Sequence, residues 1–248
     1  PYLQAAHWRQ ALQTYGANPP AELDAQIASF LRGHESEPVA QDLRTTWLAS
    51  LAARARWTEF LAFHKPSSDG PALRCHGYAA RLAQGSDAGL ATQVAETWLT
   101  PRSLQECDRA FTWLAGALTP ALIEQRARNA LTAGNADFAR QIIARLPREQ
   151  ATPLLQWAAL LDDPQREIDA LIADPQKDVE PAALLAGWTK LARANRTAAR
   201  QRFEPMVRAR GLDARAASPM ALALALALAW DRDADARKYF ARVDGSSF

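Results

Sequence analysis

The sequence predicts an all-α protein, an irregular superhelix (solenoid) of about fourteen antiparallel helices. Composition is the first observation: 54 of the 248 residues are Ala, whereas Val and Ile together number 11. Ala is the strongest helix former, and β-branched residues are what strands favour. The second observation is a helical period of apolar residues that recurs between short breaks rich in Pro, Gly and Asn. Because no break divides the chain, residues 1–248 are predicted to form a single domain.

Apolar stripes at helical spacing predict the individual helices from the N-terminus onward. Pro38 and Pro181 suit the first turn of two of them, since Pro lacks the N–H that a helix start leaves unbonded. Gly134 and Asn135 suit the end of one helix and the start of the next. The stripes are Leu23/Ile27/Phe30/Leu31, Val39/Leu43/Trp47/Leu51, Leu104/Cys107/Phe111/Leu114/Leu118, Phe138/Ile142/Ile143/Leu146 and Leu184/Leu185/Trp188/Leu191.

Helix starts near residues 39, 72, 103 and 135 are spaced by roughly 31–33 residues, which is typical of arrays of helical hairpins. The residues themselves do not repeat, and no tetratricopeptide consensus is visible. An irregular stack of hairpins is therefore expected, each packing on its neighbours.

Residues 221–229 alternate Ala and Leu, a period of two that nominally indicates a strand. Both residues are strong helix formers, and Ser218-Pro219 supplies a cap and a first-turn proline. We therefore expect a buried helix that starts there. About nine residues are too few to cross a bilayer.

Charge and hydropathy exclude two classes of protein. The 29 basic and 27 acidic residues give a net charge of +2, which argues against nucleic acid as a partner. No apolar run reaches the roughly 18–20 residues of a membrane span. The chain begins at Pro1 without a charged and then apolar leader, so either a targeting segment was removed or the chain is a piece of something longer.

A search for chemistry predicts no catalytic, cofactor-binding or metal-binding residue. The four histidines, His7, His34, His64 and His76, lack metal-site spacing, and no nucleophile or phosphate-loop motif occurs. Asp231, Asp233 and Asp235 alternate as in a calcium loop but lack its glycine and terminal glutamate. A basic face (Lys190, Arg193, Arg196, Arg200, Arg202) is typical of a solvated helix, with weak anion binding as the minority interpretation. Most of the eight tryptophans are expected in the core, with one or two free to stack on sugar rings.

Cys75 and Cys107 lie about four or five residues into the first helices of consecutive predicted hairpins. Such helices stack side by side, so a disulfide is geometrically plausible. The alternative is two buried free thiols that act as small apolar groups. The spacing leaves both open.

Residues 1 to about 114 resemble the start of the superhelical domain of periplasmic soluble lytic murein transglycosylases. A looser resemblance runs through Arg126 to Asn135 and 143–147. The residues that carry it are Pro1-Tyr2-Leu3, Ile27/Phe30/Leu31, Leu48 to Trp57, Phe60 to Phe63, Cys75 with Tyr78, and Trp98-Leu99-Thr100-Pro101-Arg102-Ser103 with Cys107-Asp108 and Phe111.

This resemblance implies a superhelix that closes into a ring or U. It also implies a separate C-terminal lysozyme-like domain that cleaves MurNAc–GlcNAc strands of peptidoglycan and leaves 1,6-anhydro ends. One glutamate acts there as acid and then base. The implied location is the periplasm, and the implied partners are glycan strands and the chain's own catalytic domain. A structural disulfide between Cys75 and Cys107 is also implied.

The sequence departs from the family at the catalytic motifs. The Gly-Leu-Met-Gln that follows the catalytic Glu-Ser pair is absent, as is the Ala-Tyr-Asn-Ala-Gly block. Glu35-Ser36 is the only Glu-Ser pair, and we interpret it as a chance match. Phe248, after Asp244-Gly245-Ser246-Ser247, has the character of a cut or short tail. The chain is thus predicted to be the non-catalytic superhelical region of such an enzyme. The alternative is a stand-alone helical-repeat scaffold that binds a protein or peptide.

Overall fold

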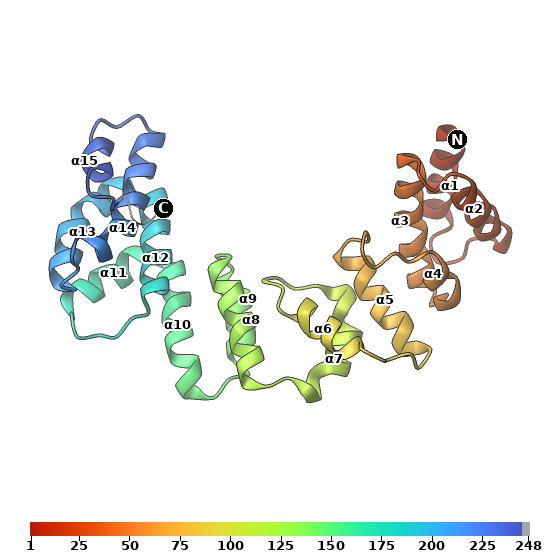
Figure 1. Ribbon diagram of the computed structural model, residues 1–248, viewed down its shortest axis with the longest axis horizontal. Coiled ribbons are helices and arrows are strands. Elements are labelled where there is room, and N and C mark those ends of the chain that lie inside the picture. The colour runs from red at the N-terminus through yellow and green to blue at the C-terminus, as the bar shows by residue number, and fades with distance from the viewer. Residues whose placement is uncertain (245–248) are drawn as a thin grey trace. The chain divides into compact units, whose positions relative to one another are not determined.

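The computed structural model describes residues 1–244 and contains no strand in that range (Figure 1). The predicted all-α class is confirmed, and residues 1–244 form fifteen α-helices in place of the fourteen expected. The helices are α1 (Tyr2–Tyr15), α2 (Ala21–Gly33), α3 (Pro38–Ala53), α4 (Trp57–Phe63), α5 (Pro71–Ala83), α6 (Leu90–Trp98), α7 (Asp108–Leu114), α8 (Pro120–Thr132), α9 (Ala136–Ile143), α10 (Arg148–Asp162), α11 (Pro164–Ala173), α12 (Pro181–Ala194), α13 (Arg196–Ala209), α14 (Ala214–Trp230) and α15 (Ala236–Phe240), with short 3-10 turns η1 (Gln105–Cys107) and η2 (Ala115–Ala117).

Contacts between helices divide the chain into two compact units. Unit 1 comprises Pro1–Trp98 and Leu104–Ala117, and unit 2 comprises Leu99–Ser103 and the chain from Leu118 onward. The single domain of residues 1–248 stays a prediction. Phe248, interpreted above as a cut, lies outside the described residues.

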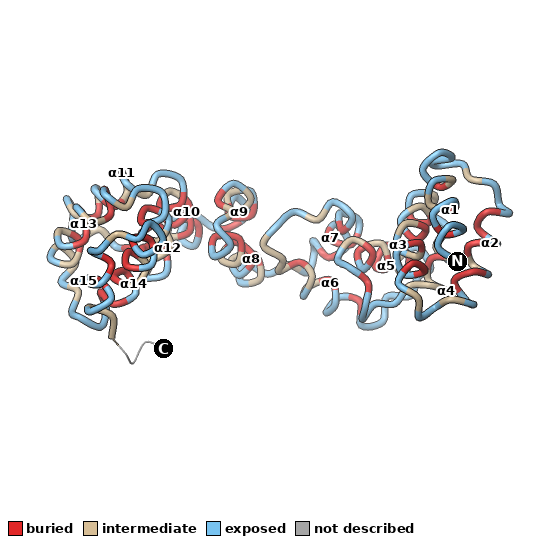
Figure 2. Tube along the Cα trace, turned by 90° about the horizontal axis from the view of Figure 1, so that it is seen from above, coloured by how far each residue is buried: buried red, intermediate tan, exposed pale blue. Residues whose placement is uncertain are grey.

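In unit 1, α3 is the central helix and packs against α1, α2, α4 and α5. Its stripe of Val39, Leu43, Trp47 and Leu51 is buried, as the four-residue spacing predicts. The α2 stripe and Phe60 of α4 are buried in the same core. Buried positions, red in Figure 2, therefore recur on the inward face of each helix.

Unit 2 is a stack of four hairpins, α8–α9, α10–α11, α12–α13 and α14–α15. The first helices of successive hairpins pack on one another, α8 on α10, α10 on α12 and α12 on α14. Among the second helices, α11 packs on α13. Gly187 allows α12 to approach α10, since a Cβ there would lie 2.9 Å from Leu160 Cβ. A hairpin array is present in this unit, but its first helices start at Pro120, Arg148, Pro181 and Ala214, and the predicted start near residue 135 begins the second helix of the first hairpin.

Two helix boundaries differ from those that the sequence predicts. The helix expected at Ser218-Pro219 begins at Ala214, where the Asp213 side chain accepts a hydrogen bond from the Ala216 N–H. Pro219 therefore lies inside α14, and Ser218 is buried. The seam from Leu104 to Leu118 forms the short α7 between two 3-10 turns. Its apolar residues are spaced correctly, but periodicity does not distinguish a tight 3-10 turn from a helical turn.

Candidate functional site

The two cysteines form a disulfide within unit 1. Cys75 lies in α5 and Cys107 ends η1, and their Cα atoms are 4.6 Å apart. Both side chains are fully buried. The bridge closes a sequence separation of 32 residues and ties α5 to the start of α7.

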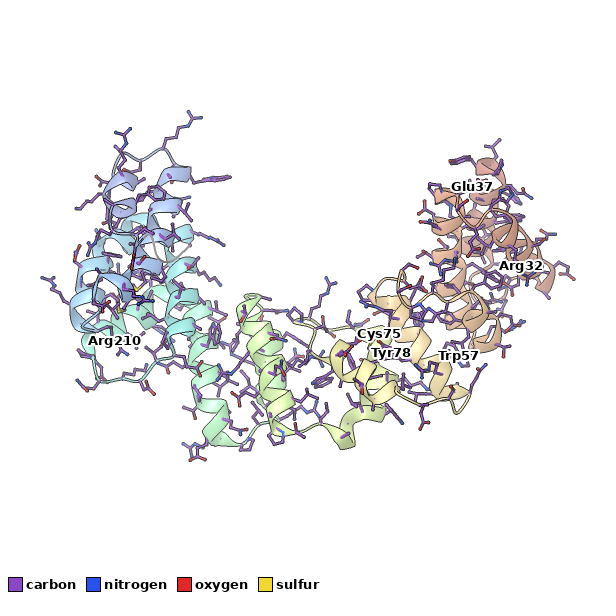
Figure 3. All side chains as sticks on the ribbon, in the orientation of Figure 1. Arg32, Glu37, Trp57, Cys75, Tyr78 and Arg210 are labelled. Carbon is purple, nitrogen blue, oxygen red and sulfur yellow. A yellow bond between two sulfur atoms is a disulfide. The ribbon has the colours of Figure 1, made fainter. Side chains whose placement is uncertain are left out.

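Three residues of the family resemblance pack around this bridge. Tyr78 lies one turn beyond Cys75 on α5 (Figure 3), and its hydroxyl is 2.9 Å from Thr97 Oγ1 of α6. Trp98, at the end of α6, packs edge-on against Phe111 of α7 with ring centroids 5.1 Å apart. The most specific part of the resemblance thus corresponds to the packing of α5, α6 and α7.

The segment Leu99–Ser103 is held by side chains of unit 2. Asn129 donates from Nδ2 to the Leu99 carbonyl at 2.8 Å, and Asn135 donates to the Pro101 carbonyl at 3.3 Å. Asn135 had been expected to cap α9, but its side chain makes no capping bond there. Arg126 donates to the Arg102 carbonyl and lies 5.0 Å from the centroid of the Phe138 ring. Burial, with Arg145 nearby, lowers the pKa of Arg126 to about 10, so it stays charged at neutral pH.

A polar pocket in unit 1 carries several ionisable groups. It lies between the end of α2, the start of α3 and the segment after α4, and its volume is about 610 Å³. We call it the α2–α4 pocket. Its polar lining includes Arg32, Glu35, Gln41, Asp42, Arg44, Lys65 and Asp69, and Phe63 supplies an apolar wall.

Asp69 anchors the floor of this pocket. Its carboxylate is fully buried and accepts from Arg44 Nη2 at 2.5 Å and from the Lys65 backbone N–H at 2.8 Å. His64 Nδ1 lies 2.6 Å from its other oxygen. Burial alone raises the pKa of Asp69, but the bonds from Arg44, Lys65 and His64 outweigh burial and lower that pKa below its usual value. Asp69 is therefore ionised at neutral pH and fixes the loop that precedes α5.

His64 is the neutral partner in this cluster. Burial lowers its pKa by more than the Asp69 carboxylate raises it. A neutral imidazole has one N–H, and the ionised carboxylate can only accept, so the proton is on Nδ1. The other nitrogen, Nε2, packs against Gly77, where a Cβ would lie only 2.3 Å away. His64 is thus a structural residue, and Gly77 is required by its close approach.

Glu35, the member of the only Glu-Ser pair, lies at the rim of the same pocket. Its side chain is 68% exposed and forms an ion pair with Lys65. The hydrogen bond and charge of Lys65 lower the pKa of Glu35. A general acid near neutral pH needs a raised pKa, which burial in an apolar site supplies. Glu35 has the opposite environment and is unsuited to that role.

The basic face and the acidic loop predicted separately in the C-terminal part form ion pairs with each other. Arg196 Nε is 2.6 Å from Asp231, and Arg200 Nη1 is 2.8 Å from Asp235 and 3.6 Å from Asp233. These pairs leave less free charge for an anion or a calcium ion than either sequence pattern alone indicates. Over residues 1–244, no cluster of three or more His, Cys, Asp or Glu side chains could hold a metal ion.

The tryptophans divide as expected between core and surface. Trp8, Trp47, Trp98, Trp157 and Trp188 are buried. Trp230 is 86% exposed and borders an apolar groove between α12 and α14, and Trp113 is 41% exposed. None of the helices in the described range is both long and apolar enough to span a membrane.

A second buried ionic network supports unit 1 at a distance from the pocket. Asp24 of α2 accepts from both terminal nitrogens of Arg54, at 2.7 and 2.9 Å, and from Trp47 Nε1 at 2.7 Å. Burial raises the pKa of Asp24, but these three bonds and the Arg54 charge lower it overall. All donors come from α3 and its C-terminal end, so Asp24 fixes α2 onto α3.

Comparison with known proteins identifies the class to which these features correspond. The soluble lytic murein transglycosylase of Salmonella typhimurium is 28% identical over 141 residues, which is 56% of this chain and 22% of the relative. The enzyme of the same name from Escherichia coli K12 is 27% identical over the same coverage. No family model matches the chain.

Solved structures share the fold of this chain over nearly its whole length. The 70-kDa soluble lytic transglycosylase of Escherichia coli has a TM-score of 0.67 at 21% identity, covering 94% of this chain and 38% of that one. The same enzyme in complex with bulgecin A has a TM-score of 0.69 at 20% identity, covering 99% and 40%. An inactive mutant of lytic transglycosylase Slt from Pseudomonas aeruginosa has a TM-score of 0.66.

The chain therefore has the helical fold of these proteins. Its sequence is similar to that of the soluble lytic murein transglycosylases, as the N-terminal resemblance predicted. It spans about a fifth of the length of the curated relatives in sequence and about two fifths of the solved chains in structure.

Sequence reasoning did not find the α2–α4 pocket or the Asp24 network. Arg44 lies on α3, 25 residues before Asp69, and neither it nor the nearby His64 is unusual in its own segment. One signal was available: Asp69-Gly70-Pro71 ends the polar segment 65–71, and Asp side chains in turns commonly accept hydrogen bonds from nearby backbone.

Proposed function

We propose that this chain is the non-catalytic superhelical region of a periplasmic peptidoglycan lytic transglycosylase. In the intact protein, a separate catalytic domain cleaves MurNAc–GlcNAc strands and leaves 1,6-anhydro ends. The superhelical region holds that domain and shapes the approach of the glycan strands.

One observation carries the proposal. The solved transglycosylase structures match 94–99% of this chain, whereas the chain covers only 38–40% of theirs. The larger part of such an enzyme therefore lies outside the match. The environment of Glu35 supports the same division of labour, because the one Glu-Ser pair of the chain lacks the raised pKa of a general acid.

The disulfide supports the periplasmic location. Disulfides persist in oxidising compartments such as the bacterial periplasm and are rare where thiol reductants act. Cys75 and Cys107 are buried and joined, and the described structure holds no free cysteine.

The test begins with the parent reading frame beyond the codon for Phe248. A Glu-Ser pair followed by Gly-Leu-Met-Gln is expected there. The whole protein should release 1,6-anhydro muropeptides from purified murein, and residues 1–248 alone should release none. A stop codon directly after Phe248 would instead support the alternative, a stand-alone helical-repeat scaffold for a protein or peptide.

A further inference from the structure

We propose that the α2–α4 pocket binds a short peptide that carries both a free carboxylate and a free ammonium group. Within the proposed function, on which this inference rests, that ligand is the stem peptide of murein with its diamino acid. The superhelical region would then recognise the peptide branches of the wall in addition to guiding its glycan.

The pocket has the size and the composition of a ligand site. Its volume of about 610 Å³ falls within the range of roughly 300–1,000 Å³ that is usual for small-molecule sites. All of its walls come from unit 1, and the buried Asp69 cluster holds its floor. A pocket with a fixed floor loses little entropy when a ligand binds.

Arg44 supplies a positioned carboxylate receptor. Its Nη1 donates to the Phe63 carbonyl at 2.9 Å and its Nη2 to Asp69 at 2.5 Å, while the side chain remains 13% exposed. A guanidinium carries five N–H donors, so these two bonds leave three unused. Because Arg44 lines the pocket and is already fixed in place, a ligand carboxylate can accept from it without ordering a flexible chain.

Arg32 adds a second cation on the same pocket. It is exposed, forms no ion pair with any residue of the described range, and lies 5.4 Å from the centroid of the Phe63 ring (Figure 3 labels Arg32). By contrast, Lys65 at the rim is already paired with Glu35. Arg32 and Arg44 therefore form the carboxylate side of the pocket.

Asp42 provides the complementary charge. Its carboxylate lines the pocket, is exposed, and has no ion-pair partner within residues 1–244. Gln41, exposed beside it, offers an amide that can bond a peptide backbone. One unpaired cation and one unpaired anion on the same pocket match a ligand of both signs better than a neutral sugar or a simple anion.

The experiment is calorimetric titration of residues 1–248 with synthetic N-acetyl-L-Ala-γ-D-Glu-diamino acid tripeptide, in which the diamino acid carries the only ammonium group. Two matched peptides serve as controls, one with amidated carboxyl groups and one with Ala in place of the diamino acid. Arg32→Gln should weaken binding of the tripeptide by about tenfold, and the fully amidated peptide should not bind. Arg74→Gln removes an exposed arginine of the same unit that does not line the pocket, so it should leave binding unchanged.

Asp42→Asn tests the ammonium side separately. It should weaken the diamino peptide about fivefold and leave the Ala peptide unaffected. Circular dichroism and melting of each variant establish that the fold is retained, which the exposure of both side chains leads us to expect.

Three results would overturn the inference: no binding of the tripeptide, equal binding of the amidated peptide, or tighter binding of glycan strands stripped of peptide. None of these three results would contradict the proposed function if the parent reading frame encodes the catalytic motifs. If the tripeptide binds and the frame ends at Phe248, the pocket assignment stands and the transglycosylase proposal fails.

Discussion

Reduction of the Cys75–Cys107 bridge should destabilise unit 1 by a predictable amount. The bridge closes a separation of 32 residues. In the chain-entropy model, a loop of this length stabilises the folded state by about 4 kcal/mol at 25 °C, because the open chain gains freedom only when unfolded. That energy corresponds to nearly a thousandfold change in the opening equilibrium.

Hydrogen exchange measures this effect in each unit. The slowest amides of α5 and α7 should exchange up to about a thousandfold faster in the reduced protein than in the oxidised protein. Amides of α10 and α12, in the unit without cysteines, serve as the internal control and should keep their rates. The C75A/C107A variant should behave like the reduced protein, with a further loss from the two small cavities left in a fully buried site.

Two results would refute this reasoning. A loss below about 1 kcal/mol would mean that the unfolded unit is already compact around these residues, so the cross-link removes little entropy. Equal acceleration in α12 would mean that the two units unfold as one.

Three further perturbations test the packing and the buried charges. Gly77→Ala should lower the free energy of unfolding, measured by urea titration, by about 1–3 kcal/mol, because the new Cβ would meet His64 Nε2 at 2.3 Å. Gly116→Ala is the control. A Cβ there would have nothing within 4 Å, so this variant should be close to neutral in the same titration. Asp24→Asn should cost about 3–5 kcal/mol at pH 7, because it leaves Arg54 buried without its counter-charge, and a loss near zero would show that water reaches the site. In the wild type, the pKa of Asp24 is lowered on folding, so the unfolded chain binds more protons; the stability from this group is present above about pH 4 and is lost as pH falls through the folded pKa. Urea midpoints at pH 7 and pH 3 should therefore converge between wild type and Asp24→Asn, and a constant difference would contradict this assignment.

The sequence predicts the helices because their determinants are local. The stripe of Val39, Leu43, Trp47 and Leu51 becomes the buried face of α3, since burial of an apolar stripe is what stabilises a helix in a protein. The predicted start of α14 was wrong because it, too, relied on local signals alone. Ser218-Pro219 is a strong start signal, but Asp213 lies five residues earlier and caps the helix. Pro219 is therefore an interior residue that removes one i→i−4 backbone hydrogen bond, a cost of roughly 3 kcal/mol that the burial of α14 offsets.

The pocket could not be predicted because its members meet only through tertiary packing. Arg44 and Asp69 are 25 residues apart, whereas His64 precedes Asp69 by five residues in the segment between α4 and α5. The sequence shows an arginine on a helix and an aspartate in a loop, both of which are usually solvated. Only the packing of α3 against α4 and α5 buries them together. In that buried ion pair the Arg44 side chain is held in one position, whereas a solvated arginine would be free to move.

The predicted spacing of about 31–33 residues reappears in the contacts that join neighbouring hairpins. Trp188 Nε1 donates to the Met220 carbonyl across 32 positions, Arg202 bonds Asp169 across 33, and Arg200 bonds Asp235 across 35. Asn129 reaches Leu99 across 30, and the disulfide of unit 1 spans 32. The chemistry of these contacts is not repeated along the chain: they are an indole hydrogen bond, two Arg–Asp ion pairs, an amide hydrogen bond and a covalent bond. A stack of hairpins needs only that each hairpin bonds the next, so the structural period persists without any repeat of residues. This explains why a hairpin array could be predicted from a spacing of helix starts without a visible repeat consensus, although the start near residue 135 belongs to the second helix of its hairpin.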